Sequence, residues 1–245
     1  MEAIQDYILR AKKWELERTR KLIFEELRKR YARPNKGIVL YGSLNKGFNT
    51  FQIRTILNAT KKPKLKLAFT IMAFAGLRVG EVVRVKLEDV DFNRKVLRVR
   101  SEKGSREDFI PLVQELYDLL KVWCESREHE IRSAHGHVLY SGVKTQALSK
   151  NWIRNELRQL LAKLGIQKVY GIAKDSNFKK PGSTKRLNLY STHSFRHFFV
   201  TQIYKQSKDV ALASRAARHR SYSSTQTYIH NSEEELRESL EKTFK

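Results

Sequence analysis

Five side chains, far apart along the chain, could act together on a phosphodiester bond. They are Arg78, His193, Arg196, His219 and Tyr228. A tyrosine hydroxyl can attack phosphorus and keep the bond energy in a covalent ester. Arginine holds phosphate oxygens with a planar fork and never loses its proton, so two arginines can stabilise the charge that builds up during the attack. These residue types indicate covalent chemistry on phosphorus, with arginines supplying the charge that a metal ion would otherwise provide.

Each of these residues also has an ordinary structural interpretation when it is taken alone. Arg78 could be a buried arginine that pairs with Glu81, three residues later. Tyr228 could be a packed aromatic residue, and Tyr222 is a nearby rival for the role of nucleophile. A lone His-x-x-Arg arises by chance in many chains. Only the complete set, in this chain order, favours a reactive site.

In this order the residues resemble the catalytic signature of tyrosine recombinases, the phage integrase family. The signature stands here in Gly-Leu-Arg-Val-Gly-Glu at 76–81, His-Ser-Phe-Arg at 193–196 and the segment 218–228. The resemblance implies that Tyr228 is the nucleophile and forms a 3′-phosphotyrosyl link. It makes Arg78 and Arg196 the two phosphate clamps and His193 the general acid or base. His193 and Arg196 are three residues apart, so they share one face if 193–196 is helical.

Three further residues match the family pattern. His219 lies nine residues before Tyr228 and matches a second histidine that donates to the phosphate. Lys103 matches a hairpin lysine that protonates the leaving 5′ oxygen, and Arg106 could take its place. Glu81 matches an acidic residue that orients its neighbours. The resemblance implies no cofactor and no metal.

The chain departs from the family pattern at three places. Ala217-Arg218-His219 stands where the family usually has Leu-Gly-His, and Ser194-Phe195 stands where it usually has Asp-Leu. The stretch 167–190 is also longer than is common. These departures bear on the subfamily and the substrate more than on the chemistry. In its general character the chain resembles archaeal plasmid or virus integrases.

The charge of the chain indicates an anionic partner. Among 245 residues, 49 are Lys or Arg and 26 are Asp or Glu, giving a net charge of +23, and nucleic acid is the leading candidate. The longest apolar run, 67–77, has eleven residues, too few to span a bilayer. Cys124 is the only cysteine, which favours a reducing, cytoplasmic location beside the nucleoid. The residues predicted to contact DNA are Lys179, Lys180, Lys185, Arg186, Arg218 and Arg220.

Apolar spacing divides the chain into two parts. Residues 2–31 have helical spacing, and the breaker Arg-Pro-Asn-Lys-Gly at 33–37 follows them. We therefore expect a basic helical segment at 1–36, a remnant or minimal form of a core-binding region, and a catalytic domain at 37–245.

The second part is expected to be α+β and mostly helical, a tyrosine-recombinase catalytic domain with a small three-stranded antiparallel sheet. Predicted strands are 85–90, 95–100 and 107–112, with Lys103 at a hairpin tip. The basic stretch 167–190 is predicted to be a long loop or hairpin. The predicted helices are 51–59, 65–75, a short one from Val79, 113–125, 149–164, 193–206, 208–217, 223–230 and one from Ser232.

The predicted function is site-specific DNA recombination or integration. Its partners would be duplex DNA and three further copies, a homotetramer on synapsed DNA that could be a monomer without DNA, with no role for a membrane. Two other functions remain open at this point. One is DNA relaxation of the type IB topoisomerase kind, which shares the chemistry, and the other is a DNA-binding accessory protein without a working site.

Overall fold

The computed structural model of the chain describes residues 15–19, 22–23, 26, 46–100, 108–142, 146–174 and 184–218. The chain divides into two units, Met1–Val39 and Leu40–Lys245. In the first unit the described residues 15–19, 22–23 and 26 are helical. The rest of the predicted helix 2–31, and the helices predicted at 223–230 and from Ser232, lie outside the described residues.

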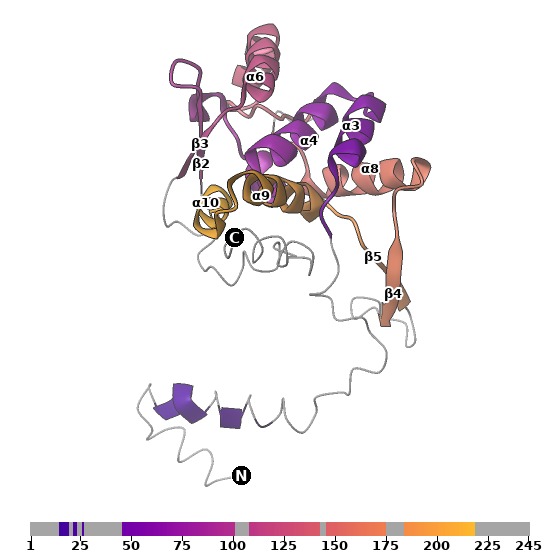
Figure 1. Cartoon of the computed structure of the whole chain (residues 1–245). Helices are drawn as coiled ribbons and strands as arrows, with labels where there is room; N and C mark the ends of the chain where they lie inside the picture. The colour runs from indigo at the N-terminus through magenta and orange to yellow at the C-terminus, as the bar shows by residue number, and fades with distance from the viewer. Residues whose placement is uncertain are drawn as a thin grey trace, which may run out of the picture. The chain divides into compact units, whose positions relative to one another are not determined.

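The second unit is built mainly from helices that surround α4 and α9 (Figure 1). Helix α4 contacts α3, α5, α6 and α9, while α9 also contacts α10. A short helix, α7, was not predicted. The helices are α3 (Thr50–Ala59), α4 (Pro63–Ala75), α5 (Val79–Val82), α6 (Gln114–Ser126), α7 (Glu128–Ser133), α8 (Lys150–Lys163), α9 (His193–Ser207) and α10 (Val210–Ala216).

Helix α4 is central because it is apolar nearly all round. Pro63 occupies its first turn, where its missing N–H is not needed, and buried residues follow on every face. The helix ends at Gly76, whose φ of 63° is left-handed. A Cβ at this position would lie 2.3 Å from the ring of Phe199, so glycine also allows α9 to approach closely. The helix predicted at 65–75 is present, and it ends at this glycine.

The predicted three-stranded antiparallel sheet is present, with strand order β1-β2-β3. Strand β2 (Val96–Val99) and strand β3 (Asp108–Pro111) lie within the predicted ranges, and Leu97 pairs with Ile110 between them. The tip that joins them, 101–107, lies outside the described residues.

The predicted first strand at 85–90 is wrong, because β1 covers only Val90–Asp91. Residues Leu87–Asp89 instead form a 3₁₀ turn. The buried Asp89 carboxylate closes this turn by accepting the backbone N–H of Lys86 at 3.0 Å. It also accepts the Nε atoms of Arg98 at 2.9 Å and Arg100 at 2.8 Å. Because the Asp89 side chain binds both the backbone of its own turn and arginines from the following segment, the turn is favoured over the extended conformation that the apolar residues in 85–90 would prefer.

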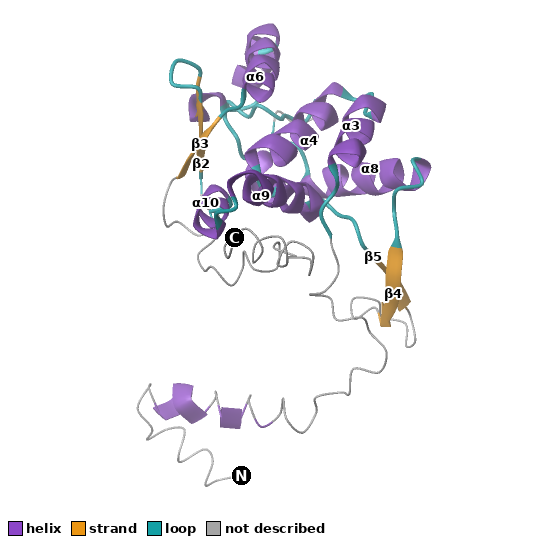
Figure 2. Ribbon diagram, viewed as in Figure 1, coloured by secondary structure: helices purple, strands orange, loops and turns teal. Residues whose placement is uncertain are grey.

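Strands β4 (Val169–Lys174) and β5 (Thr184–Asn188) form a separate antiparallel ribbon. The ribbon follows α8 and precedes α9 in the chain, and Figure 2 shows it extending away from the helices. Of the two forms predicted for 167–190, the hairpin is the one observed.

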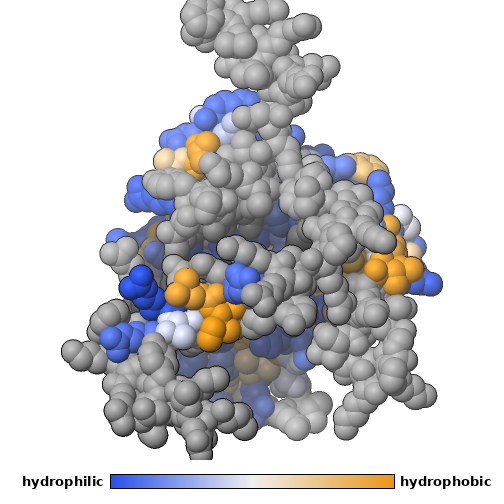
Figure 3. Space-filling model, turned by 90° about the horizontal axis from the view of Figure 1, so that it is seen from below, coloured by the Kyte–Doolittle hydropathy of each residue, from blue (hydrophilic) through white to orange (hydrophobic). Residues whose placement is uncertain are grey.

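Seen from below, the described surface is mostly hydrophilic, with some hydrophobic groups among the polar ones (Figure 3). No helix in the described part of the chain combines the length and the hydrophobicity needed to cross a membrane.

Candidate active site

Arg78 lies at the sharp junction between α4 and α5. Its backbone is extended, with φ −72° and ψ 151°, and it caps the one-turn helix that carries Glu81. The Glu81 carboxylate accepts the backbone N–H of Arg78 at 2.8 Å and its Nη1 at 2.9 Å. Glu81 is 8% exposed, whereas the Arg78 side chain is 42% exposed. The carboxylate therefore fixes Arg78 from beneath and leaves much of its guanidinium at the surface.

Arg196 is brought to the same junction by α9. Its side chain is 1% exposed, and its neighbour Phe195 is fully buried. The Nη1 of Arg196 donates to the carbonyl of Gly76 at 2.7 Å, and its Nη2 donates to the carbonyl of Ala217. Arg196 thus joins the ends of α4 and α10, and the Gly76 carbonyl that it binds lies two residues before Arg78.

His193 is the first residue of α9, and aromatic packing holds this end of the helix. Phe48 stacks on Tyr190 at 4.9 Å between ring centroids, and Phe195 stacks on Phe69 at 5.2 Å. Burial lowers the pKa of His193, and the charges of nearby arginines lower it further, although Glu81 opposes them. The imidazole therefore favours its neutral form, which can accept a proton.

Arg218 also belongs to this cluster. Its Nη2 lies 2.8 Å from the Glu81 Oε2, and both side chains are 8% exposed. It was predicted as a DNA-binding candidate, and the structure buries its guanidinium against a carboxylate. The sequence offered one signal of this role, the replacement of the family's usual glycine by an arginine.

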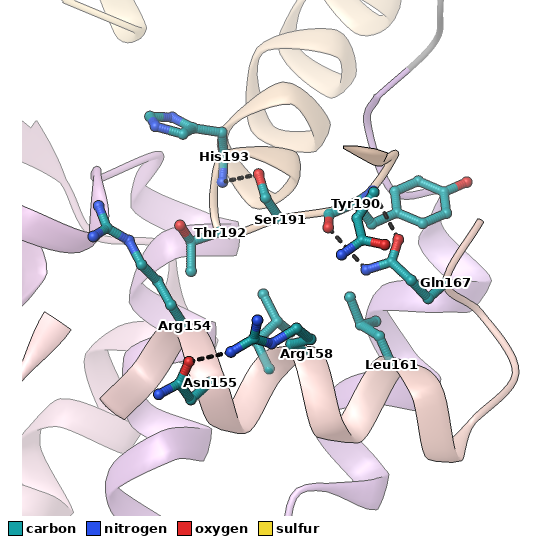
Figure 4. Close-up of a pocket in the computed structure, with 11 residues that line it drawn as sticks. Arg154, Asn155, Arg158, Leu161, Gln167, Tyr190, Ser191, Thr192 and His193 are labelled. Atoms are coloured by element: carbon teal, nitrogen blue, oxygen red, sulfur yellow. Dashed lines mark hydrogen bonds between the residues drawn. The ribbon is translucent and has the colours of Figure 1, made fainter. Parts of the chain in front are cut away.

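A pocket of about 350 Å³ adjoins His193, between α8 and the segment 188–193. Figure 4 shows Arg154 on the same side of this pocket as the His193 imidazole, and Arg158 further along α8. Arg158 donates to Asn155 at 2.5 Å, and Gln167 bonds both backbone groups of Tyr190. Neither arginine was predicted to belong to the site. The available signal was their four-residue spacing on α8, where each directly follows a buried apolar residue, Ile153 or Leu157.

The arrangement suits an anionic substrate. Arg78, Arg196 and Arg218 carry three positive charges around the single negative charge of Glu81, which leaves an excess of two. Burial strengthens such interactions because water screens them less. The structure thus brings together Arg78, Glu81, His193 and Arg196, from segments that lie more than a hundred residues apart.

Other predicted site residues lie elsewhere or outside the described part of the chain. Arg186 is on β5 and exposed, and Lys185 precedes it on the same strand. Those outside the described residues are Lys103, Arg106, Lys179, Lys180, His219, Arg220 and Tyr228.

The fold of the chain is found in recombinases of known structure. A crystal structure of XerA recombinase matches with a TM-score of 0.62 and 22% identity, covering 81% of this chain and 65% of that one. The XerH site-specific recombinase bound to its difH substrate gives 0.60 and 18%, covering 82% and 55%. The Tn1549 transposon integrase with a circular intermediate DNA gives 0.61 and 15%, covering 88% and 69%.

Residues 46–235 match the phage integrase family, and the chain belongs to this family. It is 28% identical over 203 residues to tyrosine recombinase XerA of Thermococcus onnurineus, covering 82% of this chain and 63% of the relative. It is 29% identical over 175 residues to tyrosine recombinase XerH of Campylobacter jejuni, covering 70% and 42%. The chain therefore spans less than two thirds of the length of these relatives. The resemblance seen in the sequence is confirmed.

Proposed function

We propose that the chain cleaves and rejoins duplex DNA at a specific site, as a site-specific recombinase or integrase. One observation carries this proposal. Arg196 donates to the carbonyl of Gly76, two residues before Arg78, so two arginines 118 positions apart share one helix junction. Their charges also act together on His193 and Glu81. Two guanidinium groups beside a histidine are the donors that a phosphoryl transition state requires.

The proposed reaction uses Tyr228 as the nucleophile. Its oxygen bonds to phosphorus, the bond from phosphorus to the 5′ oxygen breaks, and a 3′-phosphotyrosyl ester forms. His193, in its neutral form, accepts the proton of the Tyr228 hydroxyl, Lys103 donates the proton that the 5′ oxygen needs, and His219 donates to the phosphate. Religation reverses these steps with a different 5′ hydroxyl, which exchanges strands. Arginines provide the charge stabilisation, so the proposal includes no metal or cofactor.

The family and the names of the relatives support duplex DNA as the partner. The XerH and Tn1549 proteins are described as DNA complexes, and this chain adds a net charge of +23. We propose that 37–245 is the catalytic domain, that 1–36 is a reduced core-binding segment, and that four copies act on synapsed DNA near the nucleoid. Because contacts with DNA phosphates would supply most of the binding affinity, DNA binding should weaken steeply as the salt concentration rises.

The test is covalent capture on nicked duplexes made from the DNA that flanks the gene. A nick beside the cleavage point releases a short fragment and prevents religation, so the protein–DNA adduct accumulates. We expect an adduct that survives SDS in the wild type and in Tyr222→Phe, and none in Tyr228→Phe. An adduct that persists in Tyr228→Phe, or no adduct with any duplex that the protein binds, would contradict the proposal.

A second experiment tests the proposed acid. Lys103→Ala should slow cleavage of ordinary DNA, because the 5′ oxygen then leaves without a proton. A duplex with a 5′-thiol leaving group should restore the rate, because sulfur leaves as a stable anion. Lack of rescue would assign the acid to Arg106 or His193 instead.

A further inference from the structure

Arg218 has an unusual backbone conformation. Its φ is 55°, in the left-handed region, where the family usually has glycine. A residue with a Cβ pays about 1–2 kcal/mol in this conformation. The chain thus places a long side chain where glycine would fit without strain.

The Arg218 side chain is also costly to bury. Its guanidinium is 8% exposed, and among the described residues its Nη1 is buried without a hydrogen-bond partner. An unsatisfied buried donor costs about 1–3 kcal/mol. Local stability alone therefore explains Arg218 poorly, since glycine would avoid both costs.

Arg218 binds the group that orients Arg78. The Oε2 of Glu81 accepts both the Nη2 of Arg218 and the backbone N–H of Arg78, each at 2.8 Å. The Oε1 accepts the Nη1 of Arg78 at 2.9 Å. One carboxylate therefore joins the Arg78 junction to Arg218, the residue after the C-cap of α10. Because that carboxylate is shared, it neutralises Arg78 less than it would if it served Arg78 alone.

A second bond holds the same segment. The carbonyl of Ala217 accepts the Nη2 of Arg196. The two consecutive residues 217 and 218 are thus tied to two different site residues, and the next residue in the chain is His219. The fixed end of α10 sets where the segment that leads toward Tyr228 begins.

We propose that Arg218 is a positioning residue that locks the Glu81 carboxylate, and through it Arg78, to the end of α10 that precedes His219. The inference rests on the proposed DNA cleavage. The charges on Glu81 agree with it. Burial alone would raise the pKa of Glu81, but Arg218 is the largest of the influences that lower it, ahead of Arg78 and Arg196, and the pKa lies below its ordinary value. Near this group lie His193, which responds to Glu81, and Asp108, which acts on Arg218.

The test compares three variants, Arg218→Gln, Arg218→Lys and Arg218→Gly, in single-turnover adduct formation at saturating protein. DNA affinity and thermal stability are measured separately. We expect Arg218→Gln to cleave about tenfold to a hundredfold more slowly, as for small misplacements of catalytic groups, with affinity changed less than about threefold. Arg218→Lys should recover part of the rate because it keeps the charge. Arg218→Gly relieves the backbone strain, yet it should cleave as slowly as Arg218→Gln.

The pH profile adds a readout that a purely structural role would not change. In Arg218→Gln, Glu81 loses its largest lowering influence, so cleavage should fail at a higher pH on the acidic side than in the wild type. Arg98→Gln is the matched control, since it removes a guanidinium from a different buried carboxylate, Asp89. It should lose stability but keep the wild-type rate and profile.

Three results would overturn the inference. Arg218→Gly could cleave like the wild type, which would make the residue dispensable. Arg218→Gln could lose affinity with an unchanged saturated rate, which would make Arg218 a direct phosphate contact. A wild type that forms no adduct would instead remove the proposed function, and the role of Arg218 with it.

Discussion

Replacing Glu81 by Gln should destabilise the protein strongly, although the two side chains have nearly the same shape. Glu81 and Arg218 are each 8% exposed, so the change leaves a buried guanidinium without its counter-charge. Breaking a buried ion pair from one side costs about 3–5 kcal/mol. The pair with Arg78 adds at most about 1 kcal/mol, because that side chain is 42% exposed. We therefore expect a loss of about 3–5 kcal/mol, or roughly 6–20 °C in Tm for a chain of this size.

The assay is urea unfolding followed by circular dichroism, without DNA and at low salt. The pKa of Glu81 is lowered in the folded state, so its contribution is present above its ordinary pKa and is lost as pH falls through the folded value. The gap between wild type and Glu81→Gln should therefore close in acid. The matched control is Asp89→Asn, whose partners Arg98 and Arg100 are 29% and 38% exposed and should be affected less. A loss of under about 1 kcal/mol for Glu81→Gln, or a gap independent of pH, would refute the reasoning.

Three further predictions concern single groups. Gly76→Ala should lower the free energy of unfolding by about 2–5 kcal/mol, from ring overlap and left-handed strain, while Gly142→Ala, with open space around it, should be nearly neutral in the same urea assay. The pKa of His193, measured by NMR titration, should lie below its ordinary value, and Glu81→Gln should lower it further because the Glu81 charge raises it. His193 therefore stabilises the fold above its unfolded pKa, and this contribution is lost as pH falls through the folded pKa. An unshifted pKa would contradict the burial argument. Cys124, whose pKa burial raises to about 12, should react with a thiol reagent only in denaturant, and rapid labelling of the folded protein would show that this part of the core is open.

Periodic elements could be predicted from the sequence because their signals are local. Helix α4 follows from a run of apolar residues that Gly76 ends, and α8 follows from its apolar spacing with Ser149 as its cap. The cap of α3 is Asn49, and Gln52 completes a capping box with it. These features require only residues within one or two turns of each other.

The errors came from side chains that act at a distance. The strand expected at 85–90 is mostly a turn because Asp89 binds arginines 9 and 11 residues further on. The ion pair of Arg218 with Glu81 was not predicted, because the two residues are 137 positions apart. Helix α7 buries Ile131 alone and has too little periodicity to be recognised. Chain order selected the candidate site residues, but only the packed structure shows that Arg78 and Arg218 share the Glu81 carboxylate.

The β4–β5 ribbon has a consequence for handling the protein. A two-stranded ribbon has unpaired backbone groups along both outer edges, and such edges invite pairing with another molecule. Val169 and Ile172 add exposed apolar side chains, while Lys168 and Arg186 are exposed cations that repel a second copy. Concentrated salt screens this repulsion within a few ångströms. A purification that uses salt to strip nucleic acid would therefore weaken the charges that keep neighbouring molecules apart, and precipitation would begin at these strand edges.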